Sequence, residues 1–366
     1  MPIRRFRDRR PRLLAPSQIL RPPVRQSGGG RWREDLVREA RGTIGRGSRS
    51  FAFASRLLDR PTRERAWLLY AWCRRGDDIV AGDRPEGAED AENLIQAIRV
   101  LTRRALDGQP TADPAFDGFG QVAQEAGLGL QLADDVIEGF ALDAAGWQPH
   151  SEADLIRYCY HAGGAVAVMM ARIIGVPEDD EERLDRAFEL GVAFELIAIA
   201  RDLCDDDAAE RCHLPLDWLA EADIPPGEHL KPTFRGPLVA LAGRLLDLAE
   251  AYAASALRGT EGLGFRQRWA VLTAANIYLA IGRKVRERGA HAWDHRVATS
   301  AFDKLGAMFR GFMEALDAPL PAATPRYTRG AVLLAVRMEG PVAPIPMTPL
   351  RDEDVRVEAP GDGEGL

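Results

Sequence analysis

Hydrophobic residues recur at three- and four-residue spacing along most of the middle of the chain. This spacing places apolar side chains on one face of a helix. No stretch shows the strict alternation between tight turns that indicates a β-strand. We therefore predict an all-α protein, with long helices over residues 63–80, 154–174, 182–203, 237–257 and 266–288.

The two ends of the chain differ from this helical middle. Residues 1–33 contain many arginines, several prolines and three consecutive glycines, and residues 339–366 are rich in Pro, Gly, Asp and Glu. Such compositions are typical of disorder, so we expect a basic arm and an acidic tail. The arm either touches anionic lipid headgroups or has no role. The remaining 34–338 segment has no solenoid-like repeat and predicts a single helical domain.

Composition excludes several classes of protein. The net charge of −7 argues against a nucleic-acid binder, and neither GxGxxG nor GxxxxGK[ST] occurs. No apolar run is long enough to span a bilayer, and no secretory signal is visible. The four cysteines have no CxxC spacing, which fits free thiols in a cytoplasmic protein; they are Cys73, Cys159, Cys204 and Cys212.

Two acidic clusters stand at the ends of predicted apolar helices. The first contains Asp77 and Asp78, and the second contains Asp202 and Asp206. Asp202 and Asp206 are four residues apart, so they project from one helix face and repel each other. Solvated acidic helix ends would explain each cluster alone. Two clusters of this kind, each flanked by arginine, also fit a shared cation site.

Magnesium is the cation that this arrangement favours. Mg²⁺ prefers oxygen ligands and is commonly held by one or two carboxylates together with substrate phosphates. If the two helix ends face each other, they form a cup for a diphosphate group. Arg74 and Arg201, which stand beside the clusters, would then hold phosphate oxygens by charge-assisted hydrogen bonds.

Several ordered motifs resemble the phytoene synthase/squalene synthase family over about residues 43–310. They include the two aspartate segments and a C-terminal segment closest to bacterial phytoene synthases. The motifs are GSRSFAFASRLL (47–58), LLYAWCRRGDDIV (68–80), IEGFALD (137–143), YCYHAGGAVAVMMARIIG (158–175), RDLCDDDAAERCHLP (201–215) and YLAIGRKVRERGAHAWDHRVATS (278–300).

The resemblance implies an isoprenoid synthase-type helical bundle around a central cavity. It also implies a prenyltransferase of carotenoid biosynthesis that joins two geranylgeranyl diphosphates head to head. The product, phytoene, forms through a cyclopropyl diphosphate with release of diphosphate. Mg²⁺ is the expected cofactor, with Mn²⁺ as an alternative ion, and NADPH is not expected. Alternatives are a squalene- or dehydrosqualene-type synthase acting on farnesyl diphosphate, or a non-catalytic binding or assembly protein on the same fold.

The resemblance also assigns roles to residues. Metal binding falls to Asp77, Asp202 and Asp206, with Asp78 as a further catalytic carboxylate and Tyr158 and Tyr278 near the reacting carbons. The substrate-binding residues are Ser48, Ser50, Tyr70, Arg74, Arg201, Ala162, Val166 and Glu195. Asp143 matches an acidic family position of less clear role.

The chain departs from the family pattern at several site positions. Ala81 replaces an aspartate in the first motif, and the nearest acid, Asp83, is two residues further along. Glu195 and Ala198 stand where Gln and Asn are usual, and His213 replaces a tyrosine. These changes predict a weaker metal site unless Glu195 or Asp83 compensates.

The implied substrate and product determine the expected partners. Long prenyl diphosphates and their hydrocarbon product partition into lipid. We therefore expect peripheral contact with the inner face of the cytoplasmic membrane, contact with other carotenoid-pathway enzymes, and no nucleic-acid partner.

Overall fold

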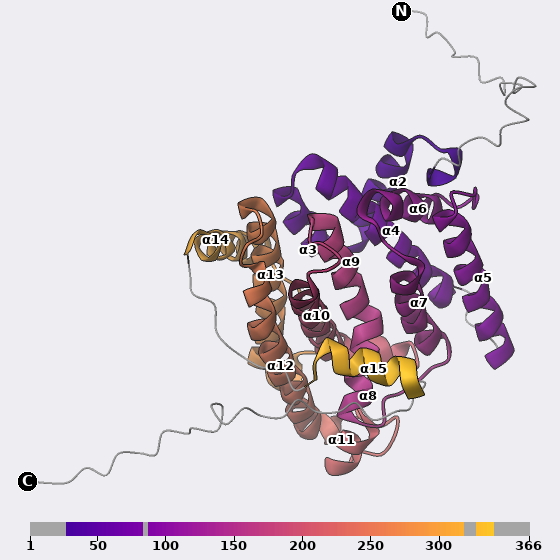
Figure 1. Cartoon of the computed structure of the whole chain (residues 1–366). Coiled ribbons are helices and arrows are strands. Elements are labelled where there is room, and N and C mark those ends of the chain that lie inside the picture. Colours follow the sequence, from indigo (N-terminus) through magenta and orange to yellow (C-terminus); the bar gives the residue numbers. More distant parts are fainter. Residues whose placement is uncertain (1–26, 83–86, 318–326, 340–366) are drawn as a thin grey trace, which may run out of the picture.

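The computed structural model describes residues 27–82, 87–317 and 327–339, and every regular element among them is helical (Figure 1). This confirms the predicted all-α class. Four predicted helices match single elements closely: α4 (Arg60–Gly82), α10 (Glu181–Ala208), α12 (Arg235–Leu257) and α13 (Phe265–Arg288).

The fifth predicted helix, over residues 154–174, is three elements. They are α8 (Glu152–Cys159), a π-helical turn η3 (Tyr160–Gly164) and α9 (Ala165–Ile174). The backbones of η3 and α10 are in direct contact here. A Cβ on Gly163 would stand only 2.6 Å from the carbonyl oxygen of Gly191, so only glycine fits at this position. Side-chain periodicity does not reveal a π turn, and such turns are frequent at functional sites.

The sequence did not single out the other helices, several of which have clear end signals. Asp113 caps α6 and Pro114 occupies its first turn, while Gly127 ends it in the left-handed conformation. A capping box between Ser151 and Asp154 starts α8. The remaining helices are α2 (Arg33–Gly47), α3 (Arg49–Ala54), α5 (Ala88–Leu106), α6 (Pro114–Ala126), α7 (Leu130–Ala144), α11 (Leu216–Glu221), α14 (Ala301–Asp317) and α15 (Arg329–Glu339).

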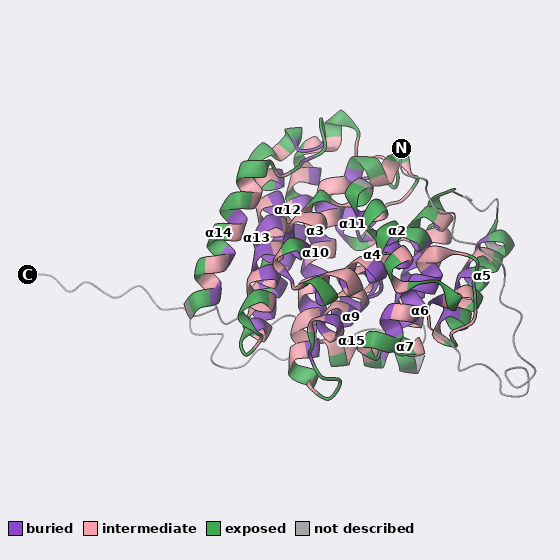
Figure 2. Cartoon of the chain, turned by 90° about the horizontal axis from the view of Figure 1, so that it is seen from above, coloured by how far each residue is buried: buried purple, intermediate pink, exposed green. Residues whose placement is uncertain are grey.

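Helix α10 stands at the centre of the bundle, where it packs against α9, η3, α12 and α13 (Figure 1). Val192, Leu196 and Ala200 on this helix are completely buried. The buried side chains of all these helices form one continuous core, with exposed residues on the outer faces (Figure 2). The described residues therefore form one domain around α10.

Residues 27–33, at the end of the predicted basic arm, contact helix α6. The Ser27 hydroxyl donates a hydrogen bond to Gln121 at 2.9 Å, and the Arg31 Nε donates to the buried Asp117 at 2.9 Å. These bonds fix residues 27–33 against α6, so assigning them to a disordered arm was wrong. The rest of the arm, 1–26, and the tail residues 340–366 lie outside the described residues, as does Asp83.

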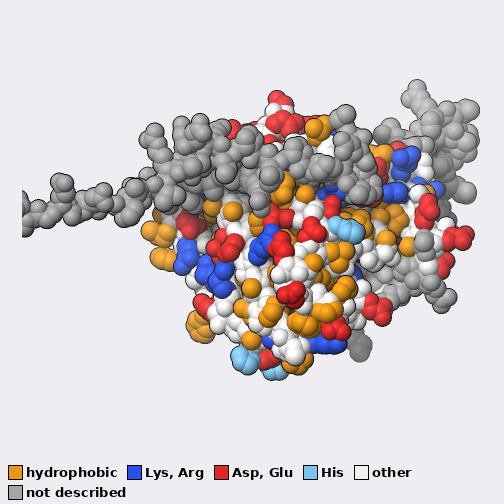
Figure 3. All heavy atoms as spheres, turned by 90° about the horizontal axis from the view of Figure 1, so that it is seen from below, with side chains coloured by type: hydrophobic (Ala, Val, Ile, Leu, Met, Phe, Trp, Pro, Cys, Tyr) orange, Lys and Arg blue, Asp and Glu red, His pale blue; other side chains and the backbone are white. Residues whose placement is uncertain are grey.

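Charged and apolar side chains are interspersed on the surface shown in Figure 3. The apolar stretch at residues 163–176 belongs to the core, because Val168, Met169 and Ile173 of α9 are buried there. Among the described helices, none combines the length and the apolar character needed to cross a membrane.

Candidate active site

A cavity of about 340 Å³ runs along α10 between α3, α4, α9 and α13. Ser48, Ser50, Tyr70, Glu195 and Tyr278 line it, together with Ala162 and Val166, which the resemblance assigns to substrate binding. Arg183 and Ala198 of α10 both border it, and a helix rises ~1.5 Å per residue, so the lining extends ~22 Å along α10. An elongated, mostly apolar cavity of this kind suits a long hydrocarbon chain.

Small side chains form much of the cavity wall. Gly163 and Ala167 contribute from η3 and α9, and Ala187, Gly191 and Ala198 contribute from α10. Ala198 stands in the wall near Glu195, so no amide oxygen is available where the family pattern has Asn. Ala81, the other departure, is exposed near the end of α4.

Two aromatic pairs border the cavity. The Tyr278 ring stacks on Phe194 at 4.1 Å between centroids, and Tyr70 stacks on Phe51 at 5.3 Å. Burial raises the pKa of Tyr70 to about 12 and also raises the pKa of Tyr278, so both phenols stay neutral near neutral pH. They can offer hydrogen-bond donors and ring faces to a bound molecule.

The two carboxylates of the first acidic cluster have different environments. Asp78 and Arg74 form an ion pair at 2.8 Å, and both side chains are 47% exposed, so they face solvent. Water also reaches Asp77, but the surrounding protein and the nearby Asp143 raise its pKa to about 7. Asp77 is therefore the carboxylate of this pair that faces other acids.

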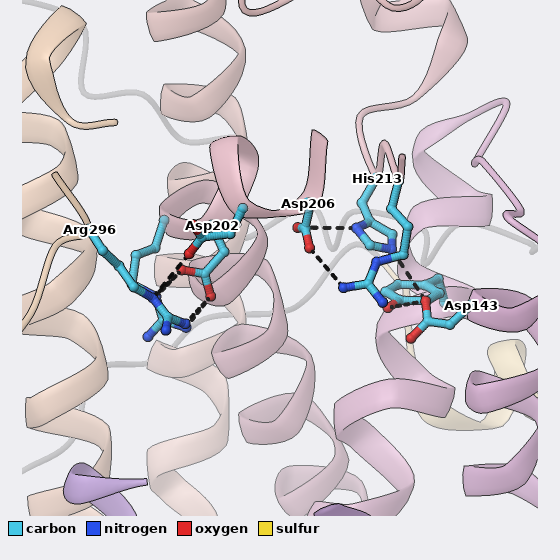
Figure 4. Close-up of polar contacts among 9 residues, drawn as sticks. Asp143, Asp202, Asp206, His213 and Arg296 are labelled. Atoms are coloured by element: carbon cyan, nitrogen blue, oxygen red, sulfur yellow. Dashed lines mark hydrogen bonds and ion pairs between the residues drawn. The ribbon is translucent and has the colours of Figure 1, made fainter. Parts of the chain in front are cut away.

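His213 links Asp143 of α7 to Asp206 of α10 (Figure 4). Its Nε2 lies 3.5 Å from Asp143 Oδ1, and its Nδ1 lies 3.5 Å from Asp206 Oδ2. Burial alone would lower the pKa of His213, but the two carboxylates outweigh it and raise the pKa to about 9. His213 thus places a positive charge between two acids from different helices.

Tyr158 and Arg211 complete this network. The Tyr158 hydroxyl donates to Asp143 at 3.0 Å, and its ring stacks on His213 at 4.5 Å. Arg211 donates to Asp206 at 3.3 Å. Tyr158 is buried against Asp143 and His213 and is not among the residues that line the cavity, unlike Tyr278.

Asp202 has different neighbours from Asp206, although both project from α10. Arg296 donates to its two oxygens at 3.0 and 2.9 Å, and Arg201 donates to it at 2.7 Å (Figure 4). Partial burial alone would raise the pKa of Asp202, but these arginines lower it below its usual value. Asp202 is thus held by two cations, either of which could turn to a phosphate instead.

Glu195 lies among the remaining acids. Burial raises its pKa, His213 lowers it, and Asp143, Asp206 and Asp77 raise it further, to about 7. Negative charge is therefore incompletely compensated where α4, α7 and α10 meet. A bound divalent cation would relieve this repulsion.

The side chains of this acidic cluster are the type of ligand that Mg²⁺ prefers, because carboxylates offer oxygen atoms. Within the described residues, however, no three acidic, His or Cys side chains converge closely enough to hold a metal by themselves. Mg²⁺ often keeps several waters and takes substrate phosphate as a ligand, so one or two carboxylates per ion suffice.

Sequence patterns assigned no functional role to Arg211 and Arg296, and left the part played by His213 open. Both arginines occur within the motif segments, but Arg211 lies beyond the end of α10, and Arg296 is 94 residues from Asp202, so helix spacing connects neither arginine to its acid. The sequence marks His213 only as a departure from the family tyrosine. His213 lies in the loop between α10 and α11, and its charge depends on Asp143 of α7 and Asp206 of α10, so the fold was needed to show it.

Comparisons with known proteins identify the family of this chain. A family model described as squalene/phytoene synthase matches residues 44–303. A phytoene synthase from Pseudescherichia vulneris is 40% identical over 297 residues, covering 80% of this chain and 96% of its own length. A 15-cis-phytoene synthase from Pantoea ananas is 39% identical with the same coverage, 80% and 96%.

Solved structures show the same fold. A dehydrosqualene synthase in complex with ligand superimposes with a TM-score of 0.69 at 22% identity, covering 76% of this chain and 96% of that one. The helical bundle and its acid-rimmed cavity define the isoprenoid synthase class of fold. Within that class, the chain belongs to the squalene/phytoene synthase family.

Proposed function

We propose that this protein condenses two molecules of geranylgeranyl diphosphate head to head to give phytoene in carotenoid biosynthesis. The observation that supports this best is the apolar cavity of small side chains that reaches Glu195, beside the acids and arginines of α4, α7 and α10. The relatives at about 40% identity, named phytoene synthase, favour the same substrate and product.

Each part of the substrate has a matching part of the site. Prenyl chains would lie along α10 against small apolar residues, which exclude water from the reacting carbons. The diphosphates would lie at the charged end, where Arg201 and Arg296 can exchange Asp202 for phosphate oxygens. Ser48, Ser50 and Tyr70 line the cavity and could donate further hydrogen bonds.

Asp77 and Asp206 would hold Mg²⁺, or Mn²⁺ in its place, with Asp202 joining once its arginines turn to the substrate. The bound ion would neutralise the leaving diphosphate. His213 and Tyr158 hold Asp143 in position, and Arg211 holds Asp206. These contacts keep the carboxylates from moving when the substrate binds.

The condensation needs no external reductant. In the first stage one allylic C–O bond breaks, and the resulting cation attacks the double bond of the second molecule. Loss of a proton then closes the cyclopropane ring. In the second stage the remaining diphosphate leaves, the skeleton rearranges, and another proton is lost. The ring faces of Tyr278, Phe194 and Tyr70 beside the cavity suit positively charged intermediates.

Product analysis tests this proposal. Purified protein is incubated with geranylgeranyl or farnesyl diphosphate and Mg²⁺, with and without NADPH, and with a chelator in parallel. We expect phytoene from geranylgeranyl diphosphate without NADPH, and no product with the chelator. Hydrocarbon from farnesyl diphosphate alone would favour the squalene- or dehydrosqualene-type alternative.

Substitution of Asp206 tests the role of the carboxylates. Asp206→Asn should reduce turnover by at least ~100-fold, since it removes charge needed at the leaving group. Its neighbour Asp205 provides the control, because this side chain is 61% exposed and its nearest contact to Arg296 is a loose 3.4 Å. Asp205→Asn should retain most activity, and equal losses in both variants would contradict the proposed site.

A further inference from the structure

The segment between α13 and α14 brings Arg296 to the charged end of the site. It begins with a short turn, η6 (Gly289–His291), and residues 296–300 have no regular secondary structure. The Arg296 side chain is 62% exposed, yet two of its donors reach both oxygens of Asp202, as Figure 4 shows. A long, exposed side chain on irregular backbone has many conformations open to it. Other contacts are therefore needed to hold this segment in place.

Trp293 ties this segment to α10, three residues before Arg296. Its side chain is buried, and the indole Nε1 donates a hydrogen bond to the carbonyl oxygen of Ala200 at 3.0 Å. Because a carbonyl oxygen has two lone pairs, it can accept this bond in addition to a bond within its own helix. Ala200 stands two residues before Asp202, only ~3 Å along the helix axis. The bond from Trp293 and the ion pair of Arg296 therefore join the same two segments.

Helix α12 also holds this segment. The Arg235 guanidinium lies over the Trp293 ring, 5.9 Å from its centroid, and its Nη2 lies 3.8 Å from Asp294 Oδ1. Val297, which follows Arg296, is buried in the core. Arg296 is thus an exposed residue between two buried anchors, Trp293 and Val297. Its position depends on how firmly these anchors are held.

We propose that Trp293 is a positioning residue for the diphosphate site: its bond to Ala200 holds Arg296 beside Asp202, where the guanidinium can turn to phosphate oxygens. The phosphate role of Arg296 rests on the proposed function. Trp293 is not among the residues that line the prenyl cavity, so it acts through Arg296. Loss of its N–H should weaken binding of the diphosphate group and leave the fit of the prenyl chain unchanged.

Binding of inorganic diphosphate tests this role without any turnover. The full chain with Mg²⁺ is titrated with diphosphate in a calorimeter. Trp293→Phe keeps a buried aromatic ring but removes the N–H, and it should raise the Kd by about 5-fold, the usual effect of one lost hydrogen bond. The KM for geranylgeranyl diphosphate should rise by a similar factor with less than ~2-fold change in kcat, because Trp293 does not touch the reacting carbons.

Trp269 provides a matched control, because its indole makes the same kind of bond elsewhere. Its Nε1 donates to the carbonyl oxygen of Met308 at 2.9 Å and joins α13 to α14 rather than to α10. Trp269→Phe should therefore leave the Kd for diphosphate unchanged. Circular dichroism shows whether both variants remain folded.

A second variant leaves the buried indole in place. Arg235 is only partly buried, with 30% of its side chain exposed. Arg235→Gln removes the cation over the Trp293 ring and the ion pair with Asp294, so it should weaken diphosphate binding by about 3-fold. This variant tests the proposal even if Trp293→Phe does not fold, and an unchanged Kd in Arg235→Gln would then contradict it.

A double-mutant cycle shows whether Trp293 acts through the arginine. Arg296→Ala should by itself weaken diphosphate binding by at least ~10-fold, since it removes a charge-assisted contact. In that background Trp293→Phe should change the Kd by less than ~2-fold, because the group that it positions is gone. Losses that multiply in the double variant would overturn the proposal, as would equal losses in Trp293→Phe and Trp269→Phe.

The outcome also separates this proposal from the proposed function. Coupled diphosphate binding by Trp293 and Arg296 without any hydrocarbon product would support the positioning role and contradict the condensation. Phytoene formation with a Kd that Trp293→Phe leaves unchanged would do the reverse. If the unaltered protein does not bind inorganic diphosphate, the positioning role is overturned, because Arg296 then has no phosphate site to serve.

Discussion

At the scale of single residues, the site depends on acids whose charge is only partly compensated. Asp202 is held by two arginines and has a lowered pKa, whereas Asp77 and Glu195 have pKa values raised to about 7. The carboxylates therefore differ in how strongly each favours a bound cation. Glu195 stands where the family usually has Gln, so it adds a carboxyl group to these acids that the family pattern lacks.

Replacing Glu195 by Gln should stabilise the metal-free protein at neutral and higher pH. In the unfolded chain this glutamic acid ionises at its ordinary pKa of about 4.5, while the folded one keeps its proton until about pH 7. The unaltered protein therefore loses stability relative to Glu195→Gln as pH rises between these values. At about pH 8 the variant should gain roughly 2–3 kcal/mol in the free energy of unfolding, and the gain should shrink toward about pH 5.

Urea denaturation at several pH values measures this difference. Exposed Glu92 of α5 provides the control, and Glu92→Gln should change the free energy of unfolding little at any pH. Added Mg²⁺ should narrow the gap between Glu195→Gln and the unaltered protein, because a cation compensates the carboxylate. A Glu195→Gln variant no more stable than the unaltered protein at high pH would contradict the electrostatic account of the site.

At the scale of elements, the contact between η3 and α10 sets the position of the acids. Gly163 and Gly191 allow the two backbones to touch, and Glu195 follows one turn after Gly191 on α10. The π turn in η3 interrupts an otherwise continuous helix within the cavity wall. Sequence periodicity predicted both helices but not their distance, because that depends on two glycines from separate segments.

A methyl group at this contact should be costly. Gly191→Ala should lower the free energy of unfolding by about 1–3 kcal/mol, since its Cβ would meet the backbone of Gly163. Gly45 of α2 is the matched control, because a Cβ there would find nothing within 4 Å. Gly45→Ala should stabilise the protein by about 0.5–1 kcal/mol. Thermal and chemical denaturation measure both, and equal effects would contradict close packing at Gly191.

At the scale of the whole molecule, much could be predicted from the sequence. Long amphipathic patterns predicted the helical class and four helix positions to within a few residues, because apolar periodicity reflects burial directly. The resemblance of the motifs to the family also predicted that Asp77, Asp206 and Glu195 belong to one site. The pairing of Asp202 with Arg296 and the link from Asp143 to His213 could not be predicted, since they join segments far apart in the chain.

The cavity as a whole should determine which prenyl chain is accepted. Ala187 lines the cavity near Arg183 and Arg186, away from the acidic end. Ala187→Phe fills that end and should reduce kcat/KM for geranylgeranyl relative to farnesyl diphosphate by at least ~10-fold. The exposed Ala220 of α11 provides the control, and Ala220→Phe should leave the ratio unchanged. An unaltered ratio in Ala187→Phe would place the prenyl chains elsewhere.

The central claim is that one site joins two geranylgeranyl diphosphates without a reductant. The most direct measurement is the ratio of diphosphate released to hydrocarbon formed by the purified protein with geranylgeranyl diphosphate and Mg²⁺ but no NADPH. The account predicts two diphosphates for each phytoene, with both products lost together in Asp206→Asn. Bound substrate that yields no hydrocarbon, in a protein whose helical fold is intact, would contradict the account and favour a non-catalytic binding protein.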